Sequence, residues 1–203
     1  MGRIHIDLFC SLDLVAQAPG GGEADQADDG FSYAGWQWPL MDDVVDERID
    51  AGMSGMDALL LGRRTYEFFA GFWPSPEDEV ARLFNGAHKY VASRGTPQLT
   101  WEESTRIGAD LATEVRELRD RHEKVYVSGS LDLVQTLLAE GLYDQLTLFV
   151  HPLVLGAGKK VFQGGALPTG LRLVEPAITS PKGAVVLRYE PTGRPPETGV
   201  MPS

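Results

Sequence analysis

The sequence predicts one α/β domain in which a mixed, mostly parallel sheet lies between two layers of helices. Three observations lead to this prediction. Short apolar segments that suit buried strands alternate along the chain with segments of helical apolar periodicity. The last two strand-like segments flank a short turn, which is typical of an antiparallel hairpin. The chain has 203 residues, 43% of them hydrophobic, which is enough for one large core.

The N-terminal third contains a strand, a long loop and a helix. Residues 3–10 alternate in polarity and predict the first strand. Residues 11–39 lack periodicity, and the Gly-rich, acidic part at 20–29 predicts a loop that we expect to act as a lid. Pro39 suits the first turn of a helix, and the apolar spacing that follows predicts a helix that stops at Gly52.

The remaining elements follow the same alternation. The wholly apolar run at 58–61 predicts a central strand covered on both faces. After it we expect a short helix to Phe69, a helix from Pro76 to Phe84, strands at 89–93 and 105–107, a helix from Leu111 to His122, a strand at 124–127, a helix at 131–138 closed by Gly141, a strand at 144–152, and an antiparallel pair at 171–178 and 184–189. Residues 191–203 hold four prolines and predict a disordered tail, so the domain spans 1–190.

Charge and composition exclude several classes of function. A formal net charge of −11 argues against nucleic acid and acidic membrane surfaces as partners. No apolar run reaches the roughly 18 residues of a membrane span, and His5 and Asp7 interrupt any signal-peptide core, so we expect a cytoplasmic protein. The single cysteine, Cys10, is expected to be buried and inert. The four histidines lack metal-binding spacing, so no metal is expected.

Three strand-to-helix turns carry the candidate chemistry. They lie at 61–65, 92–95 and 127–130, where parallel strands present their carboxyl ends at one edge of the sheet. Helix N-termini there offer free N–H groups, and arginines add positive charge, which together suit a phosphate group. The arginines concerned are Arg63, Arg64 and Arg94. The alternative is that these arginines pair with surface carboxylates.

These segments resemble a known superfamily. Residues 58–67, 90–94 and 125–130 are similar to the segments that hold the cofactor in dihydrofolate reductases. Residues 141–146 and 151–158, together with Ser11-Leu12-Asp13, resemble the RibD C-terminal (riboflavin-biosynthesis reductase) branch. The resemblance covers roughly residues 3 to 190, and the combination of motifs in this order is more specific than any one of them.

The resemblance implies a three-layer dihydrofolate reductase-like fold and hydride transfer from NADPH. Arg63 and Thr65 would hold the pyrophosphate, and Ser93 and Arg94 would select NADPH over NADH. The full set of implied cofactor-binding residues is Gly62, Arg63, Arg64, Thr65, Ser93, Arg94, Ser128, Gly129, Ser130 and Leu131. Relatives are often homodimers, and the apolar strand at 146–150 could contribute to such a contact.

The chain departs from the branch at the turn after 127. Riboflavin reductases commonly carry an acidic residue where Ser128 stands, and Leu131 replaces a small residue. Asp13 is followed by Leu14 where the branch usually has glycine. These departures weaken an assignment to the riboflavin pathway.

Several residues could serve the substrate. By analogy, Asp42 or Asp43 would donate the proton, and the alternative is that both favour the first helical turn electrostatically. Trp36 and Trp38 could line a pocket for a flat ring or anchor the loop, and Asp13 is a further substrate-binding candidate. The last group either touches a ligand or forms a turn with solvated lysines: Gly156, Gly158, Lys159 and Lys160.

The function that we expect from the sequence is NADPH-dependent reduction of a small pteridine- or pyrimidine-like heterocycle. Two alternatives stay open. The chain could be a non-catalytic, nucleotide-binding dimeric protein that keeps the fold, or a true dihydrofolate reductase.

Overall fold

A computed structural model describes residues 1–21, 30–75 and 79–201. Over these residues the strands are β1 (Arg3–Ser11), β2 (Ala58–Gly62), β3 (His88–Ala92), β4 (Ser104–Ile107), β5 (Lys124–Val127), β6 (Gln145–His151), β7 (Leu171–Leu173), β8 (Ile178–Thr179) and β9 (Val185–Pro191). The helices are the 3₁₀ turn η1 (Trp38–Leu40), α2 (Asp43–Met53), α3 (Arg63–Phe72), α4 (Glu79–Gly86), α5 (Leu111–Arg121) and α6 (Leu131–Ala139).

The strands of the described residues form one mixed sheet in the order β4-β3-β2-β5-β1-β6-β9-β7, with β8 also paired to β9. All pairings from β4 to β6 are parallel, and those that involve β9 are antiparallel. Parallel neighbours need crossover connections, which the helices supply. The predicted α/β class with a mixed, mostly parallel sheet is therefore confirmed.

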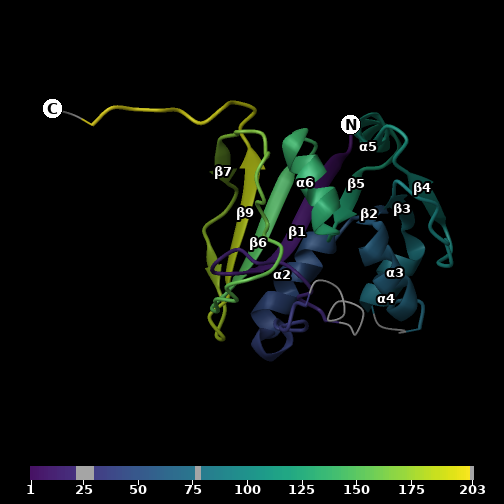
Figure 1. The fold of residues 1–203 in the computed structure, drawn as a ribbon, viewed down its shortest axis with the longest axis horizontal. Helices are drawn as coiled ribbons and strands as arrows, with labels where there is room; N and C mark the ends of the chain where they lie inside the picture. Colours follow the sequence, from purple (N-terminus) through teal and green to yellow (C-terminus); the bar gives the residue numbers. More distant parts are fainter. Residues whose placement is uncertain (22–29, 76–78, 202–203) are drawn as a thin grey trace.

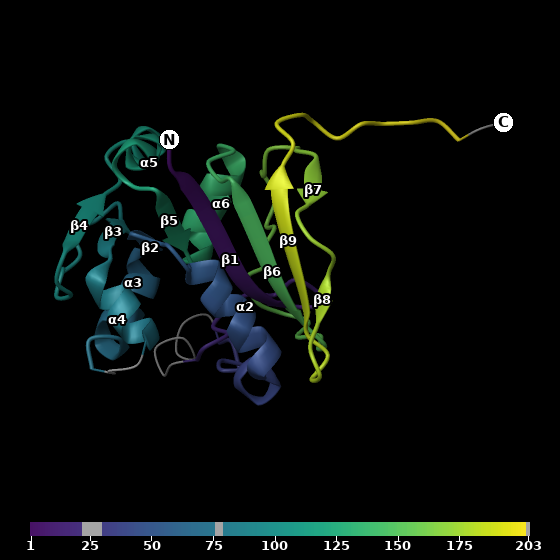
Figure 2. The same cartoon turned by 180° about the vertical axis from the view of Figure 1, so that it is seen from behind.

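Helices cover both faces of the sheet (Figures 1 and 2). One core lies between the sheet and α5 and α6, and it includes the even-numbered residues of β1 from Ile4 to Cys10. A second core lies under α3 and α4 around Tyr66 and Phe84. Cys10 is fully buried, as expected, and burial raises the pKa of its thiol to about 12, which disfavours the reactive thiolate.

The first helix differs from its prediction at both ends. Pro39 belongs to the separate turn η1, and α2 begins only after Asp42, whose side chain caps it. Gly52 does not stop the helix but lies inside it, next to Asp7 of β1. A Cβ atom on Gly52 would overlap the carboxylate of Asp7, so the glycine is needed for this close approach. The predicted start of the next helix at Pro76 lies outside the described residues.

One C-terminal prediction was wrong in detail. The strand expected at 171–178 is divided into β7 and β8, because Pro176 lacks the N–H group that a continuous ladder requires. The strand β6 lies between β1 and β9, so the segment at 146–150 is interior to the sheet, and its part in a dimer stays a prediction. Beyond Arg194, whose carbonyl accepts the Gly170 N–H, the chain runs away from the body of the domain (Figure 1).

Asp7 is the most unusual group in the interior. It is 1% exposed, and neither of its oxygens makes a well-formed hydrogen bond with a described residue, although the hydroxyls of Thr147 and Tyr126 lie near it. Desolvation raises its pKa to about 6 despite the nearby positive charges of Arg188 and Lys124. Compared with the unfolded chain, the folded state therefore favours the protonated form of the Asp7 carboxyl group, up to about pH 6.

We expect the substitution Asp7→Asn to change how stability depends on pH. Because the folded pKa lies above the ordinary value of 3.8, the stability contributed by Asp7 falls as pH rises from about 4 to 6 and then stays low. A shift of this size corresponds to roughly 3 kcal/mol. The melting temperature of the variant minus that of the wild type should therefore rise across this window. The neighbouring His5 titrates in both proteins and cancels in the difference, and a difference that is constant from pH 4 to 7 would contradict the assignment.

Candidate functional site

The candidate site lies where the turns after β2 and β5 meet. The N–H of Gly62 donates to the carbonyl of Gly129 at 3.1 Å, which joins the two turns directly. A Cβ atom on Gly62 would overlap Ser130, and one on Gly129 would lie 2.8 Å from the Thr65 hydroxyl oxygen. The structure thus brings together four of the predicted cofactor residues, and glycine at both positions permits the contact.

Two helices begin at this contact. Gly62 is the N-cap of α3 and Ser130 is the N-cap of α6, and neither makes a side-chain capping hydrogen bond. The first N–H groups of both helices therefore lack a capping side chain at the carboxyl edge of the sheet. Two adjacent positive helix ends suit a diphosphate.

Arginines surround this edge, as the sequence predicts. Arg63 is exposed and forms an ion pair with Glu67 at 2.8 Å on the same helix. Surface pairs of this kind contribute only about 0.3–0.5 kcal/mol, so an anionic ligand can displace Glu67. Arg64 is exposed beside Arg63, and Arg94 follows β3 at the same edge.

Arg106 of β4 is a further candidate that was not predicted from the sequence. Its Nε donates to the Ser93 carbonyl at 3.2 Å, so its guanidinium lies against the turn that follows β3. The hydroxyl of Ser93 itself accepts the Gly95 N–H. The sequence could have indicated Arg106 as a site residue, because the predicted parallel strand at 105–107 places it level with the end of β3.

A cavity of about 660 Å³ lies beside Arg63. Its walls come from α3 and from the segment after β3. The lining residues are Arg63, Tyr66, Glu67, Ala70, Gly71, Gly95, Thr96, Pro97, Gln98 and Thr100. It is large enough for a nucleoside.

The predicted proton donors, Asp42 and Asp43, lie at the start of α2. Asp42 accepts the Val45 N–H at 3.1 Å and the Lys182 N–H at 3.0 Å. Desolvation alone would raise the pKa of Asp42, but these hydrogen bonds outweigh it and lower the pKa. A carboxylate that is held deprotonated does not donate a proton near neutral pH. Asp43 is exposed in the first turn of α2, so both residues fit the electrostatic alternative.

Two of the three predicted substrate residues make hydrogen bonds within the protein. Trp36 is buried, donates its Nε1 proton to the Gln17 carbonyl and lies edge-on to His151. Asp13 accepts the N–H groups of Leu155 and Gly156 at 3.1 and 2.9 Å and the Ser11 hydroxyl at 2.6 Å. The Ser11 hydrogen bond, together with that from Leu155, lowers the pKa of Asp13 to about 2.

Trp38 is the third, and it stays available to a ligand. The residue is 61% exposed, while its Nε1 proton is donated to the Gly20 carbonyl at 2.6 Å. Phe68 and Phe72, which the sequence analysis overlooked, are exposed on the outer face of α3, and Phe68 lies near Gly20. The predicted lid at 20–29 falls mostly outside the described residues, since these include only Gly20 and Gly21 of it.

Among the described residues, no three histidine, cysteine or carboxylate side chains form a group that could hold a metal ion. None of the helices that the structure describes is long and apolar enough to cross a membrane.

Comparison with known proteins gives a consistent picture. The model of the RibD C-terminal domain family matches residues 3–182. The uncharacterized protein YyaP of Bacillus subtilis is 27% identical over 197 residues, which cover 94% of this chain and 96% of YyaP.

Solved structures share the fold. A Shewanella sp. PV-4 protein named provisionally for riboflavin biosynthesis superposes with a TM-score of 0.72 at 16% identity, and the match covers 94% of this chain and 99% of that one. The dihydrofolate reductase of Enterococcus faecalis, complexed with NADP(H) and RAB-propyl, superposes with a TM-score of 0.60 at 14% identity, covering 94% and 97% of the two chains. These likenesses confirm the three-layer dihydrofolate reductase-like fold.

We expect Gly129→Ala to destabilise the protein more than a glycine substitution in open space. Gly129 has φ +142°, and its new Cβ would also press on Thr65. Gly164 is a matched control, with φ +102° and no atom within 4 Å of the Cβ that alanine would add. Backbone strain should cost about 1–2 kcal/mol at either position, and the Thr65 contact should cost about 1–3 kcal/mol more at Gly129. Urea unfolding measures both, and equal losses would show that the two turns are not in contact.

Proposed function

Because the chain belongs to the RibD C-terminal domain family, we propose that it is an NADPH-dependent reductase that transfers a hydride to a small pteridine- or pyrimidine-like heterocycle. The observation that carries this proposal is the contact between Gly62 and Gly129. It brings the N-termini of α3 and α6 to one point at the carboxyl edge of the sheet, with arginines around it.

The residues present fit a dinucleotide phosphate. The turn from Gly62 to Thr65 would bind the pyrophosphate through backbone N–H groups, with Arg63 placing a guanidinium on its oxygens. Ser93, Arg94 and Arg106 would surround the 2′-phosphate that distinguishes NADPH from NADH. The cavity beside Arg63 would take the adenosine. When bound, NADPH supplies the hydride, and the protein binds and orients it.

The other half of the site would hold the acceptor ring. Trp38 and Phe68 offer exposed aromatic faces near Gly20, and stacking against such faces orients flat heterocycles. Thr65 lies three residues before Phe68 on α3, so this aromatic surface is continuous with the Gly62–Gly129 contact. The ring would thereby lie next to the nicotinamide.

One observation favours a second candidate, a protein that binds nucleotide without turnover. Neither Asp42 nor Asp7 is suited to donate a proton at the site, since the pKa of Asp42 is lowered and Asp7 is sealed beneath Gly52. Absorbance at the NADPH band separates the candidates. A reductase oxidises NADPH when pyrimidine or pteridine acceptors are added, whereas a binder takes up NADPH without consuming it. Turnover of dihydrofolate itself would indicate a true dihydrofolate reductase.

We expect wild-type protein to bind NADPH at least tenfold more tightly than NADH, as measured by titration of nucleotide fluorescence. In an Arg63→Ala, Arg94→Ala double variant the affinity for NADPH should fall at least tenfold and the preference should vanish, because each lost charge-assisted hydrogen bond contributes about 1.5–3 kcal/mol. Arg116→Ala is the matched control, since Arg116 lies on α5 and pairs with Glu140. Failure of the wild type to bind either nucleotide would rule out the proposed function.

A further inference from the structure

One wall of the cavity beside Arg63 is an irregular segment with little support of its own. Residues 95–100 belong to the connection between β3 and β4 and form neither helix nor strand. The residues of this segment that line the cavity are Gly95, Thr96, Pro97, Gln98 and Thr100. None of the hydrogen bonds between described residues involves the stretch from Thr96 to Thr100. We call this segment the 95–100 wall.

Trp101 joins the end of this wall to the opposite wall of the cavity. It is buried, although Thr100 and Glu102 on either side of it are exposed. Its backbone N–H donates to the hydroxyl of Tyr66 at 2.9 Å. Tyr66 is a buried residue of α3 that lines the same cavity. The spacing between the two walls therefore depends on where Trp101 is held.

The side chain of Trp101 is held by two further elements. Its Nε1 proton is donated to the Oδ1 atom of Asn85 on α4 at 2.7 Å, and the Nδ2 atom of Asn85 donates to the Trp73 carbonyl at 3.1 Å. On β3, the ammonium group of Lys89 lies 4.6 Å from the centroid of the Trp101 ring, within the range of a cation–π interaction. The same ammonium group donates to the Asn85 carbonyl at 2.8 Å. We call Trp101, Tyr66, Asn85 and Lys89 the Trp101 anchor.

Lys89 is the unusual member of this anchor, because its side chain is fully buried. Burial lowers the pKa of its ammonium group despite the nearby carboxylates of Glu102 and Glu103. Taking a charge out of water costs free energy, and an apolar side chain in place of a buried charge often leaves a protein at least as stable. The charge of Lys89 is therefore better explained by its contacts with Trp101 and the last turn of α4 than by overall stability.

We propose that Trp101 is a positioning residue for the adenosine half of the cofactor. It holds the 95–100 wall against α3 at the spacing that the adenosine requires, and Lys89 and Asn85 hold Trp101. This inference rests on the proposed function, which places the adenosine in this cavity. Trp101, Lys89 and Asn85 are not among the described residues that line the cavity, so they act on the ligand through the wall.

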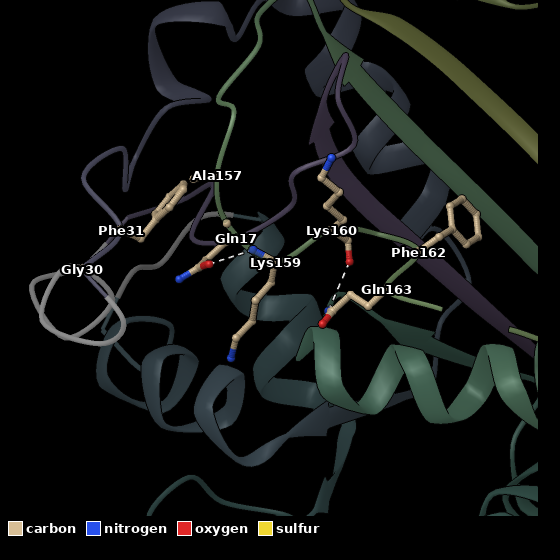
Figure 3. A pocket seen from close by; sticks show the side chains of 9 residues that line it. Gln17, Gly30, Phe31, Ala157, Lys159, Lys160, Phe162 and Gln163 are labelled. Atoms are coloured by element: carbon tan, nitrogen blue, oxygen red, sulfur yellow. Dashed lines mark hydrogen bonds between the residues drawn. The ribbon is translucent and has the colours of Figure 1, made fainter. Parts of the chain in front are cut away.

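A second cavity supplies a matched control. It measures about 560 Å³, and the residues that line it belong to the segments that follow β1 and β6 (Figure 3). Gln163 in its wall donates from Nε2 to the Lys160 carbonyl at 3.3 Å, which is one of the dashed lines in Figure 3. Gln163→Ala therefore removes one side-chain hydrogen bond from a cavity wall, as Trp101→Phe does, but in the other cavity.

The test measures the affinity of wild type, Lys89→Met, Trp101→Phe and Gln163→Ala for three ligands. Nucleotide fluorescence follows NADPH and NADH, and calorimetry follows adenosine 2′,5′-bisphosphate, which represents the adenosine half alone. In Lys89→Met and Trp101→Phe all three affinities should fall about fivefold, because each variant loses one contact of the anchor. The ratio of NADPH to NADH affinity should stay within about twofold, since the wall contacts a part that both nucleotides share. Gln163→Ala should stay within about twofold of wild type for every ligand.

Thermal unfolding separates positioning from a purely structural role. Methionine fills the place of Lys89 without its charge, so the melting temperature of Lys89→Met should rise or stay within about 3 °C of wild type. A loss of affinity without a loss of stability is the expected combination. A purely structural lysine would lower both together.

Four outcomes would overturn the inference. The first is an affinity within about twofold of wild type in both anchor variants, and the second is an equal loss in Gln163→Ala. The third is a fall in NADPH affinity without a fall in affinity for adenosine 2′,5′-bisphosphate, because the loss would then lie in the nicotinamide half. The fourth is a melting temperature of Lys89→Met that falls by more than about 3 °C together with its affinity.

The wild-type titration tells failure of this inference from failure of the proposed function. If wild type binds NADPH and the anchor variants bind it equally well, only the positioning role of Trp101 is lost. If wild type binds neither NADPH nor NADH, the proposed function fails and the positioning role fails with it.

Discussion

The hydrogen bond from Gly62 to Gly129 is the contact on which the functional edge of this domain depends. The strands β2 and β5 pair only at Ala58 and Leu59, so they separate before they reach the carboxyl edge. The turns that follow them come together again through this one backbone hydrogen bond. Neither glycine could carry a Cβ atom without displacing its neighbour. Two helix N-termini are thereby held at one point, which no single strand-to-helix turn could achieve.

At the same edge of the sheet, the segments after β1 and β6 are joined by a side chain and not by a contact between two turns. After β1 and β6 the chain enters irregular segments, and the carboxylate of Asp13 joins them by accepting N–H groups from Leu155 and Gly156. The bridge between Val15 and Lys160 extends this junction. Asp13, which was predicted from the sequence to bind substrate, thus holds the two segments of this junction together.

The carboxyl groups show how environment sets chemical role. Asp42 has a lowered pKa because backbone N–H groups of Val45 and Lys182 stabilise its charge. Asp7 has a raised pKa because burial beneath Gly52 removes it from water. Only the second could hold a proton near neutral pH, yet it lies where no ligand reaches it. Of these two residues, the one with the raised pKa is buried and the one near the surface has a lowered pKa. This is the observation that favours a nucleotide-binding protein without turnover as the second candidate.

The sequence by itself determined the order and type of almost every element, because periodicity and turn residues act over a few neighbouring positions. It also located the turns at Gly62, Arg94 and Gly129, since parallel strands must end at one edge. Tertiary structure decided what each side chain in those segments contacts. Trp36 is buried against His151, Asp42 caps α2, and Gly52 admits Asp7. The pairing of Arg106 with the turn after β3, and of Lys159 with Gln17, joins segments that lie far apart in the sequence. Such contacts depend on register and packing across the whole sheet, which local patterns do not encode.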